Sequence, residues 1–262
     1  MKLCQTTKEH VPALAALWHR VFGDSEEGIR DLLTRAPAGL RTYALLQEQT
    51  PLAALCIFPT ELIDDSGESH PTAYLYALCT EPEARGRGLA TRLLTGTERV
   101  LCAEFDYVTL TPASQALFDF YQKRGWETVF YHTTLSVPAA PAAAKITRLT
   151  PQDYRALREM QLYGDFISYD ASYLALFESA GAFYRVETAQ DVCCIAAEKR
   201  GEKLLCKETL PACPQAAALL AAHLGCVSAE LCTVGDGAPF AMGKALGKDA
   251  LPVRAYLGIA LN

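Results

Sequence analysis

Residues 73–104 read AYLYALCTEPEARGRGLATRLLTGTERVLCAE, and the rest of the chain is interpreted outward from this stretch. The run from Ala73 to Thr80 is apolar and rich in strand-forming residues, and it stops at Pro82. A short loop with the sequence Arg-Gly-Arg-Gly follows at 85–88, and from Gly88 the apolar residues recur at helical spacing. The stretch therefore predicts a strand, a glycine turn and the N-terminus of a helix.

A junction of this kind has the chemistry of an anion-binding site. The first turn of a helix has N–H groups without intrahelical partners and carries the positive end of the helix dipole. Glycine allows the backbone to approach an anion closely or to adopt a positive φ. Arg85 and Arg87 add charged donors. The alternative is an ordinary surface turn that holds two arginines, because short motifs often occur by chance.

Two well-known phosphate-binding loops do not fit this sequence. A Walker loop ends in Gly-Lys-Ser/Thr, whereas this loop continues from Gly88 as Gly-Leu-Ala-Thr. A dinucleotide fingerprint needs a third glycine and an acidic residue at the end of the next strand. Here Thr91 replaces that glycine, and Asp106 precedes the next predicted strand. The stretch is therefore a weak match to either loop.

The segment instead resembles the acetyl-CoA loop of the GNAT N-acetyltransferase superfamily, whose pattern is Arg/Gln-x-x-Gly-x-Gly/Ala. Arg85, Gly88 and Ala90 match this pattern position by position. The preceding Thr-Glu-Pro at 80–82 and the following Leu-Leu at 93–94 are also similar to the family's usual surroundings.

A second stretch, at 114–126, reads SQALFDFYQKRGW and resembles the other GNAT signature. That signature is a helix with a tyrosine four residues before Gly-aromatic, here Tyr121, Gly125 and Trp126. Ser114 stands where the family often has Asn. The alternative for Tyr121 is a core aromatic residue, because the neighbouring helix positions are also apolar.

The resemblance implies direct acetyl transfer from acetyl-CoA to a primary amine. Tyr121 would protonate the departing CoA thiolate as a general acid. The strand before the loop would pair its backbone with the pantetheine arm, as an added strand does. The residues implied in coenzyme binding are Leu78, Cys79, Thr80, Arg85, Gly86, Arg87, Gly88, Leu89, Ala90, Thr91 and Ser114.

The general base is left open by the sequence. Glu81 lies next to the loop, and Asp64, Asp65 and His132 are further possibilities. A last strand is expected over 255–261. In two-domain relatives of the enhanced-intracellular-survival type the terminal carboxylate serves the active site, which makes the carboxylate of Asn262 another candidate.

Composition limits the classes of partner. The 262 residues are half apolar and carry a net charge of −6, which predicts two domains with real cores and argues against nucleic acid. The modest acidic surplus suits a cationic amine acceptor. No apolar run is long enough for a membrane helix, and the N-terminus is not a signal peptide, so we expect a cytoplasmic protein that binds no membrane. Its oligomeric state is open.

The ten cysteines do not predict a metal site. There is no C-x-x-C, and the only adjacent pair is Cys193-Cys194. Most of the cysteines lie in apolar runs, for example Cys56, Cys79, Cys102 and Cys232. We expect buried free thiols and no metal.

The first half is predicted to be a GNAT domain over 1–138 of the α+β class, with a mixed, mostly antiparallel sheet flanked by helices. A strand at 2–6 precedes an amphipathic helix that Gly23 closes, and a second helix is expected to begin at Asp24 with a capping-box-like start. In the resembling family two such helices border the acceptor groove. The elements expected next are strands at 42–47 and 52–62, a polar loop at 64–71, the strand, loop and helix of the opening stretch, and strands at 107–111 and 127–137.

Residues 139–144 are predicted to be a linker, because the stretch from Pro138 to Ala144 combines two prolines with small residues. Over 145–262 the same order of elements recurs, starting with a strand at 145–148 and a helix that Thr150 caps. The segment before its last predicted helix, Thr-Leu-Pro-Ala-Cys at 209–213, has no glycine and no arginine. We therefore expect a degenerate GNAT-like α+β domain without a coenzyme site; an unrelated small α+β domain is the alternative.

Two functions remain in view. The first is an N-acetyltransferase that uses acetyl-CoA as co-substrate and acts on an amine-bearing acceptor that the sequence does not identify. The second is a protein that binds CoA or acyl-CoA without catalysis, as a sensor or structural partner.

Overall fold

The computed structural model describes residues 1–247, 250–252 and 254–261. The chain divides into two compact units. Unit 1 comprises 1–61, 70–110 and 243–251, and unit 2 comprises 62–69, 111–242 and 252–262. The predicted domains, 1–138 and 145–262, stay a prediction. The boundary between the compact units falls earlier because residues 132–138 of strand β6 (Glu127–Pro138) pair with β12 (Ser228–Val234).

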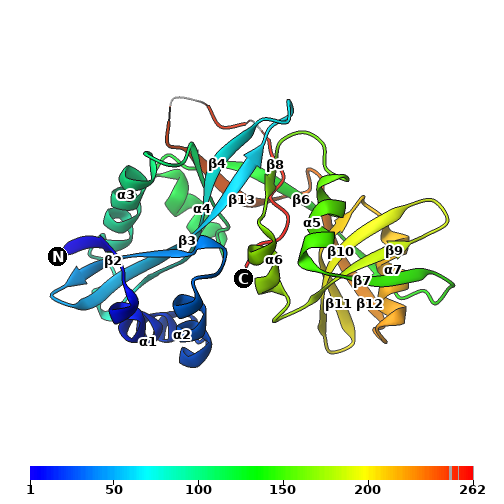
Figure 1. Cartoon of the computed structure of the whole chain (residues 1–262), viewed down its shortest axis with the longest axis horizontal. Helices are drawn as coiled ribbons and strands as arrows, with labels where there is room; N and C mark the ends of the chain where they lie inside the picture. The colour runs from blue at the N-terminus through cyan, green and yellow to red at the C-terminus, as the bar shows by residue number, and fades with distance from the viewer. Residues whose placement is uncertain (248–249, 253, 262) are drawn as a thin grey trace. The chain divides into compact units, whose positions relative to one another are not determined.

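Unit 1 is a mixed sheet with helices on both of its faces (Figure 1). Strands β1 (Lys2–Gln5), β2 (Arg41–Gln47) and β3 (Thr50–Ile63) pair antiparallel. Next to β3 lies β4 (Ser69–Thr80), and β5 (Tyr107–Leu110) pairs parallel with β4. The helices are α1 (Val11–Phe22), α2 (Glu26–Arg35) and α3 (Leu89–Leu101), with short 3-10 turns at Lys8–His10, Pro37–Gly39 and Pro82–Ala84.

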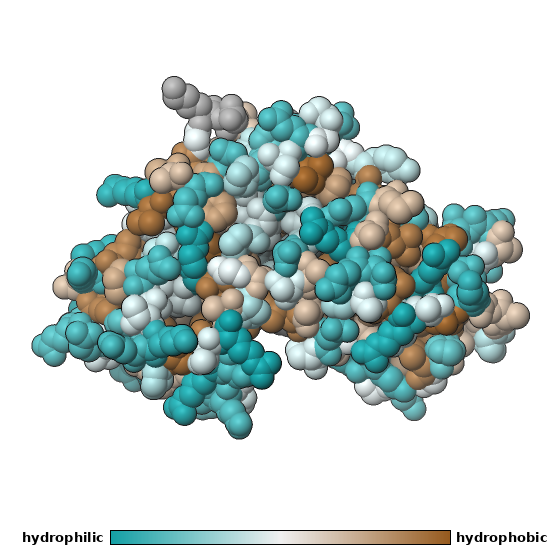
Figure 2. Space-filling view, in the orientation of Figure 1, coloured by the Kyte–Doolittle hydropathy of each residue, from teal (hydrophilic) through white to brown (hydrophobic). Residues whose placement is uncertain are grey.

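The core of unit 1 explains its continuous apolar strands. Residues 42–46 of β2 are all buried, as expected for a strand that is covered on both faces. On one face, Leu14 and Leu17 of α1 pack with Leu46 of β2 and Cys79 of β4. Helix α2 presents charged residues in its first turn, and Figure 2 shows a hydrophilic surface over this helix.

In unit 2 the paired strands follow the order β6-β12-β11-β10-β9-β7. Among these described strands only β11 and β12 pair parallel, and the other neighbours pair antiparallel. Its core is formed largely by helix α7 packed against β10, β11 and β12. The bounds are β7 (Lys145–Leu149), α5 (Pro151–Glu159), β8 (Phe166–Ser168), α6 (Ala171–Phe177), β9 (Ala182–Glu187), β10 (Val192–Arg200), β11 (Lys203–Leu210), α7 (Pro214–His223) and, near the start of the unit, α4 (Gln115–Gln122).

The order of elements in the second half follows that of the first. Each half begins with a strand and two helices, continues with three strands in succession, and then has a helix and a strand; the second half adds the short strand β8 between its two helices. The predicted α+β class and the repeat are confirmed. Thr150 caps α5 as predicted, because its hydroxyl accepts a hydrogen bond from the N–H of Asp153 at 3.1 Å.

Three features of the local structure differ from expectation. Helix α2 is capped by Ser25 and not by Asp24, since the Ser25 hydroxyl accepts from the N–H of Gly28. The run 255–261 is not a strand, because only Ala255 and Tyr256 form isolated bridges there. Strand β13 (Ala238–Ala245) was not predicted from the sequence. Its residues up to Met242 belong to unit 2, and those from Gly243 belong to unit 1.

The cysteines are free and mostly buried, as expected. Seven of the ten are buried, and two more are half-buried. Cys102 is the exception: it is exposed beyond the end of α3, where its thiol donates to the carbonyl of Arg99. No described helix has both the length and the apolar character needed to cross a membrane.

Candidate functional site

The loop between β4 and α3 depends on two glycines in left-handed backbone. Gly86 has φ of 75° and Gly88 has φ of 72°. A Cβ atom at either position would meet nothing within 4 Å. Glycine is therefore required by the positive φ of the backbone, and not by a lack of space for a side chain. The same finding shows that the space above both glycines is open.

The N-terminus of α3 has no side chain that caps it. Gly88 is the residue before the helix and has no side chain to offer as a cap, and the N–H of Arg92 makes the helical hydrogen bond back to the Gly88 carbonyl at 3.0 Å. The N–H groups of the first turn precede that bond and point out of the helix end, with the positive end of the dipole. Of the predicted positions here, Leu89 is buried, and Ala90 and Thr91 are half-buried.

Positive charge surrounds this helix end. Arg85 and Arg87 are both exposed, and Arg85 Nε donates to the carbonyl of Thr80 at 3.4 Å. That contact lays the Arg85 stem across the end of β4 and leaves its remaining guanidinium N–H groups for other acceptors. Glycine backbone, helix N-terminus and two guanidinium groups together make a site suited to a phosphate-bearing ligand.

Strand β4 changes character halfway along its length. Residues 72–75 are buried and pair with β5 as far as Tyr74 and Thr109. Ala77 then has a positive φ of 51°, which is uncommon for a residue with a side chain and marks a local kink in the strand. Because β5 ends at Leu110, the last residues of β4 extend past it. Leu78 and Thr80 are half-buried there, so an extended ligand chain has access to this edge.

Cys79, between them, belongs to the core. Its side chain packs with Leu14 and Leu17 of α1, and burial raises the pKa of its thiol to about 12. The side chain of Cys79 is therefore not open to a ligand, and a contact through its backbone stays a prediction.

Glu81 is engaged by an arginine. Arg20 of α1 donates from Nε to Oε1 at 3.0 Å and from Nη2 to Oε2 at 2.7 Å. Its charged hydrogen bond with Arg20 lowers the pKa of the Glu81 carboxyl below its usual value. A carboxylate held in this way is a poorer base, because protonation would break both charged hydrogen bonds. The Glu81 N–H also donates to the carbonyl of Leu52 on β3, so this residue ties α1, β3 and the loop together.

Tyr121 is on helix α4 in unit 2, whereas the loop belongs to unit 1. It is buried and its ring lies 5.7 Å from that of Trp126 and 5.1 Å from that of Phe120. The carbonyl of Tyr121 accepts from the N–H of Trp126, which closes the helix at Gly125. Ser114 stands just before the helix, exposed and with no side-chain cap bond.

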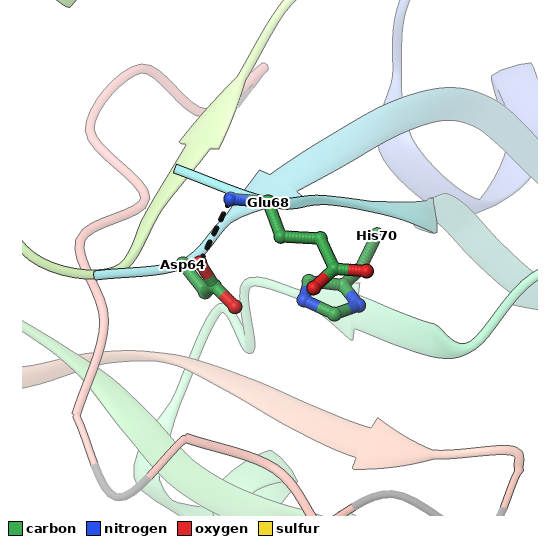
Figure 3. A group of neighbouring side chains, drawn as sticks. All are labelled: Asp64, Glu68 and His70. Atoms are coloured by element: carbon green, nitrogen blue, oxygen red, sulfur yellow. Dashed lines mark hydrogen bonds between the residues drawn. The ribbon is translucent and has the colours of Figure 1, made fainter. Parts of the chain in front are cut away.

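Figure 3 shows three potential metal ligands, Asp64, Glu68 and His70, on the hairpin of β3 and β4. One ligand atom from each lies within 4.8 Å of the others. The Asp64 Oδ1 atom already accepts from the Ser66 N–H, the Ser66 hydroxyl and the Glu68 N–H. These bonds belong to a tight Asx turn, and the turn alone brings the three side chains together.

Two other residues considered as a base are Asp65, between β3 and β4, and His132, on β6. Asp65 is exposed, and its N–H donates to Oδ1 of Asp165 at 2.9 Å. His132 on β6 stacks on Phe240 at 4.5 Å, and burial lowers the pKa of its imidazole. His132 is therefore neutral at pH 7, as a base must be. The terminal residue Asn262 lies outside the described residues.

The corresponding junction of the second half is closed by the protein's own atoms. Cys213 caps α7, with its sulfur accepting from the N–H of Ala216 at 3.4 Å. Pro214 has no N–H to offer at the first helical position. Ala216 and Ala217 in the first turn are fully buried, so their N–H groups are not open to a ligand, whereas Pro214 and Gln215 are exposed.

The strand that precedes this junction is also covered. Glu208, in β11, is completely buried and accepts from Arg158 Nε at 2.8 Å and from the hydroxyl of Tyr154. Arg158 donates further to the carbonyls of Ile167 and Leu257, at 2.8 and 3.2 Å. Gly258 has φ of 78°, and a Cβ atom there would collide with Glu208 Oε1. The chain's own segment around Leu257 thus fills the space beside β11.

Residues 3–129 match the family model described as acetyltransferase (GNAT) domain. No curated protein sequence matches the chain.

Three solved structures resemble the chain over 94–95% of its length. A probable N-acyltransferase of unknown function from Enterococcus faecalis has 14% identity and a TM-score of 0.70 over 72% of its own chain. A GCN5-related N-acetyltransferase from Anabaena variabilis has 16% identity and a TM-score of 0.70 over 73%. A tandem GNAT protein from the clavulanic acid biosynthesis pathway has 13% identity and a TM-score of 0.57 over 99%. At these identities the likeness establishes the fold, a tandem arrangement of GNAT-like units.

Proposed function

With residues 3–129 forming a GNAT acetyltransferase domain, we propose that the protein is an N-acetyltransferase that moves an acetyl group from acetyl-CoA to a primary amine. One observation carries the proposal. The N-terminus of α3 is open, uncapped and flanked by Arg85 and Arg87, and it directly follows a strand end that is accessible at Leu78. Pyrophosphate suits the first feature, and the amide-bearing pantetheine arm suits the second.

The proposed coenzyme contacts follow from these two features. The backbone of Leu78, Cys79 and Thr80 pairs with the pantetheine arm, and the loop 85–91 holds the pyrophosphate through its N–H groups and guanidinium groups. Ser114, just before α4, is proposed as a minor polar contact.

The proposed reaction is a direct transfer. The nitrogen of the neutral amine attacks the thioester carbonyl carbon, the C–N bond forms and the C–S bond breaks. The departing thiolate of CoA takes the hydroxyl proton of Tyr121, and water restores that proton. The amine gives up its own proton through water. Glu81 is proposed to position the loop and not to act as the base, because its pairing with Arg20 lowers its pKa.

Substitution of Tyr121 by Phe tests the proposed chemistry. The turnover number should fall about 10²-fold, the usual range for loss of a general acid, while the dissociation constant for acetyl-CoA stays nearly unchanged. Release of the CoA thiol with a panel of amines measures the first quantity, and calorimetry measures the second. Tyr131→Phe is the matched control, because its hydroxyl bonds to the carbonyl of Thr128 within its own strand. Unaltered turnover in Tyr121→Phe would make this residue a core aromatic.

The second candidate function is a CoA or acyl-CoA sensor. It is favoured by the second half of the chain, where the junction between β11 and α7 offers no second coenzyme site. Stabilisation by acetyl-CoA in a thermal melt, without thiol release on the amine panel, would support the sensor. No stabilisation by any CoA species would contradict both functions, with ATP and NAD as controls.

A further inference from the structure

The loop that joins α1 and α2 carries a carboxylate in an unusual setting. Trp18 Nε1 donates to Oδ2 of Asp24 at 2.7 Å, and Nδ1 of His19 donates to the Asp24 carbonyl at 2.7 Å. The residue is therefore fixed from both its side chain and its backbone. Yet Asp24 is exposed, and no described residue forms an ion pair with it.

Two further aromatic rings contact the indole that holds this carboxylate. The Trp18 ring meets the rings of Phe22 and Tyr76 edge to face, at 6.2 and 5.5 Å. Phe22 leaves 48% of its surface exposed, which is much for so large an apolar residue that ends a helix. Burial, together with the charge of Asp24, raises the pKa of the Tyr76 hydroxyl.

The surrounding charges leave the spot electronegative. Arg20 is paired with Glu81, and Arg30 is paired with Glu26 at 2.7 Å. The last carbonyls of α1 point toward the same loop and carry the negative end of its dipole. A fixed carboxylate, a helix C-terminus and exposed aromatic surface together are the setting that binds an organic cation.

The position of Tyr76 connects this spot with the proposed chemistry. Tyr76 is in β4, directly before the kink at Ala77 and two residues before Leu78, where the proposed pantetheine edge begins. A ligand that reaches Asp24 therefore lies along the strand that would hold the acetyl-bearing end of the coenzyme.

We propose that Asp24, with the rings of Phe22, Trp18 and Tyr76, binds an ammonium group of the acceptor. The amine that attacks the thioester must be neutral, so the ammonium held at Asp24 is a second amine of the same molecule. The acceptor class is thus a diamine or a longer amine with a second cationic centre. This inference rests on the proposed function for its meaning, but the binding site can be tested without turnover.

Tryptophan fluorescence measures the binding directly. The chain contains only Trp18 and Trp126, so the variant Trp126→Phe leaves the indole that bonds to Asp24 as the sole tryptophan. In that background 1,5-diaminopentane should give a saturable change with an affinity about 10-fold higher than pentane-1,5-diol, which has the same length but carries no ammonium group. The preference should vanish in Asp24→Asn, which keeps an oxygen for the Trp18 N–H, and persist in Glu27→Gln, an exposed carboxylate on α2.

The outcomes separate this inference from the proposed function. Equal affinity for the two ligands, or an unchanged preference in Asp24→Asn, would overturn the assignment of Asp24. Equal kcat/KM for 1,5-diaminopentane and 5-aminopentan-1-ol, which lacks the second amine, in a working acetyl-transfer assay would overturn it too. Asp24-dependent diamine binding without acetyl transfer to any amine would support the site and contradict the enzyme.

Discussion

The junction after β4 is open, whereas the junction after β11, at the same place in the order of elements, is filled by the protein itself. In the first, glycines at 86 and 88 face empty space and the helix end has no cap. In the second, the sulfur of Cys213 caps the helix and alanines bury its first turn. One fold thus supports both a helix end available to an anion and a helix end that needs none.

The strands before the two junctions differ in the same sense. The end of β4 is half-buried at Leu78 and Thr80, while residues 208–210 of β11 are completely covered. Arg158 and the backbone of Leu257 lie where the first half leaves its strand end accessible. A repeated domain can therefore lose a ligand site by filling it with its own buried polar groups, with no change in the order of its elements.

Removal of the buried Arg158–Glu208 ion pair beside β11 should have the largest effect on stability. Arg158→Met would leave the Glu208 carboxylate buried without its cation, which costs about 3–5 kcal/mol of unfolding free energy. Urea unfolding measures the loss. The double variant Arg158→Met with Glu208→Leu should recover most of it, since the uncompensated charge is gone. A single variant within about 0.5 kcal/mol of the wild type would mean that the pair does not hold this region together.

Closure of the open junction should remove coenzyme binding. Gly88→Val places a branched side chain at a φ of 72° and over the proposed phosphate path, so the affinity for acetyl-CoA should fall 100-fold or more, about 2.7 kcal/mol. Gly201→Val is the matched control, because Gly201 has φ of 59° and equally open surroundings in the turn between β10 and β11. It should show the same backbone strain in its melting temperature and unchanged affinity. Normal acetyl-CoA affinity in Gly88→Val would show that the ligand does not use this loop.

Substitutions of Arg20 and Glu81 should have a smaller effect on acetyl-CoA binding. If Glu81 positions the loop, Arg20→Met and Glu81→Gln should weaken acetyl-CoA binding by a similar factor of about 2–5, as expected for a half-exposed ion pair. The pH dependence of kcat should then be the same in both variants. A large fall in kcat for Glu81→Gln alone, with loss of a pH-rate inflection, would make Glu81 the base.

The same pair predicts a pH effect on stability. Because the folded protein lowers the pKa of Glu81, the pair stabilises the fold fully above the ordinary pKa of about 4.5 and progressively less as the pH falls below it. Thermal melts of the wild type and Arg20→Met should therefore converge at acid pH and differ near pH 7. Parallel curves over this range would show that the pair adds no linked stability.

The opening stretch could be predicted well because its signals are local. Glycines, arginines and a change from strand to helical spacing lie within about 20 residues, and each has a physical reason to be there. The cap by Thr150 is equally local. Asp24 was misplaced for the opposite reason: its polar side chain suits a helix cap, but the indole of Trp18 six residues earlier takes it instead.

Contacts between residues that are far apart in the chain could not be predicted from the sequence. Arg20 and Glu81 are 61 residues apart, and Arg158 and Glu208 are 50 apart, so no short pattern relates them. The run 255–261 is apolar because it is buried, yet it forms only isolated bridges; burial and strand formation give the same hydrophobic signal. The covered end of β11 was foreseen only as a missing loop.

The comparison of the two junctions leads to one central claim, that the chain has a single coenzyme site and that this site is the loop 85–91. Titration calorimetry of the wild type with acetyl-CoA tests it most directly. The result expected is one molecule bound per chain, with the same stoichiometry in variants of the second junction such as Cys213→Ser. Two molecules per chain, or none, would contradict the claim.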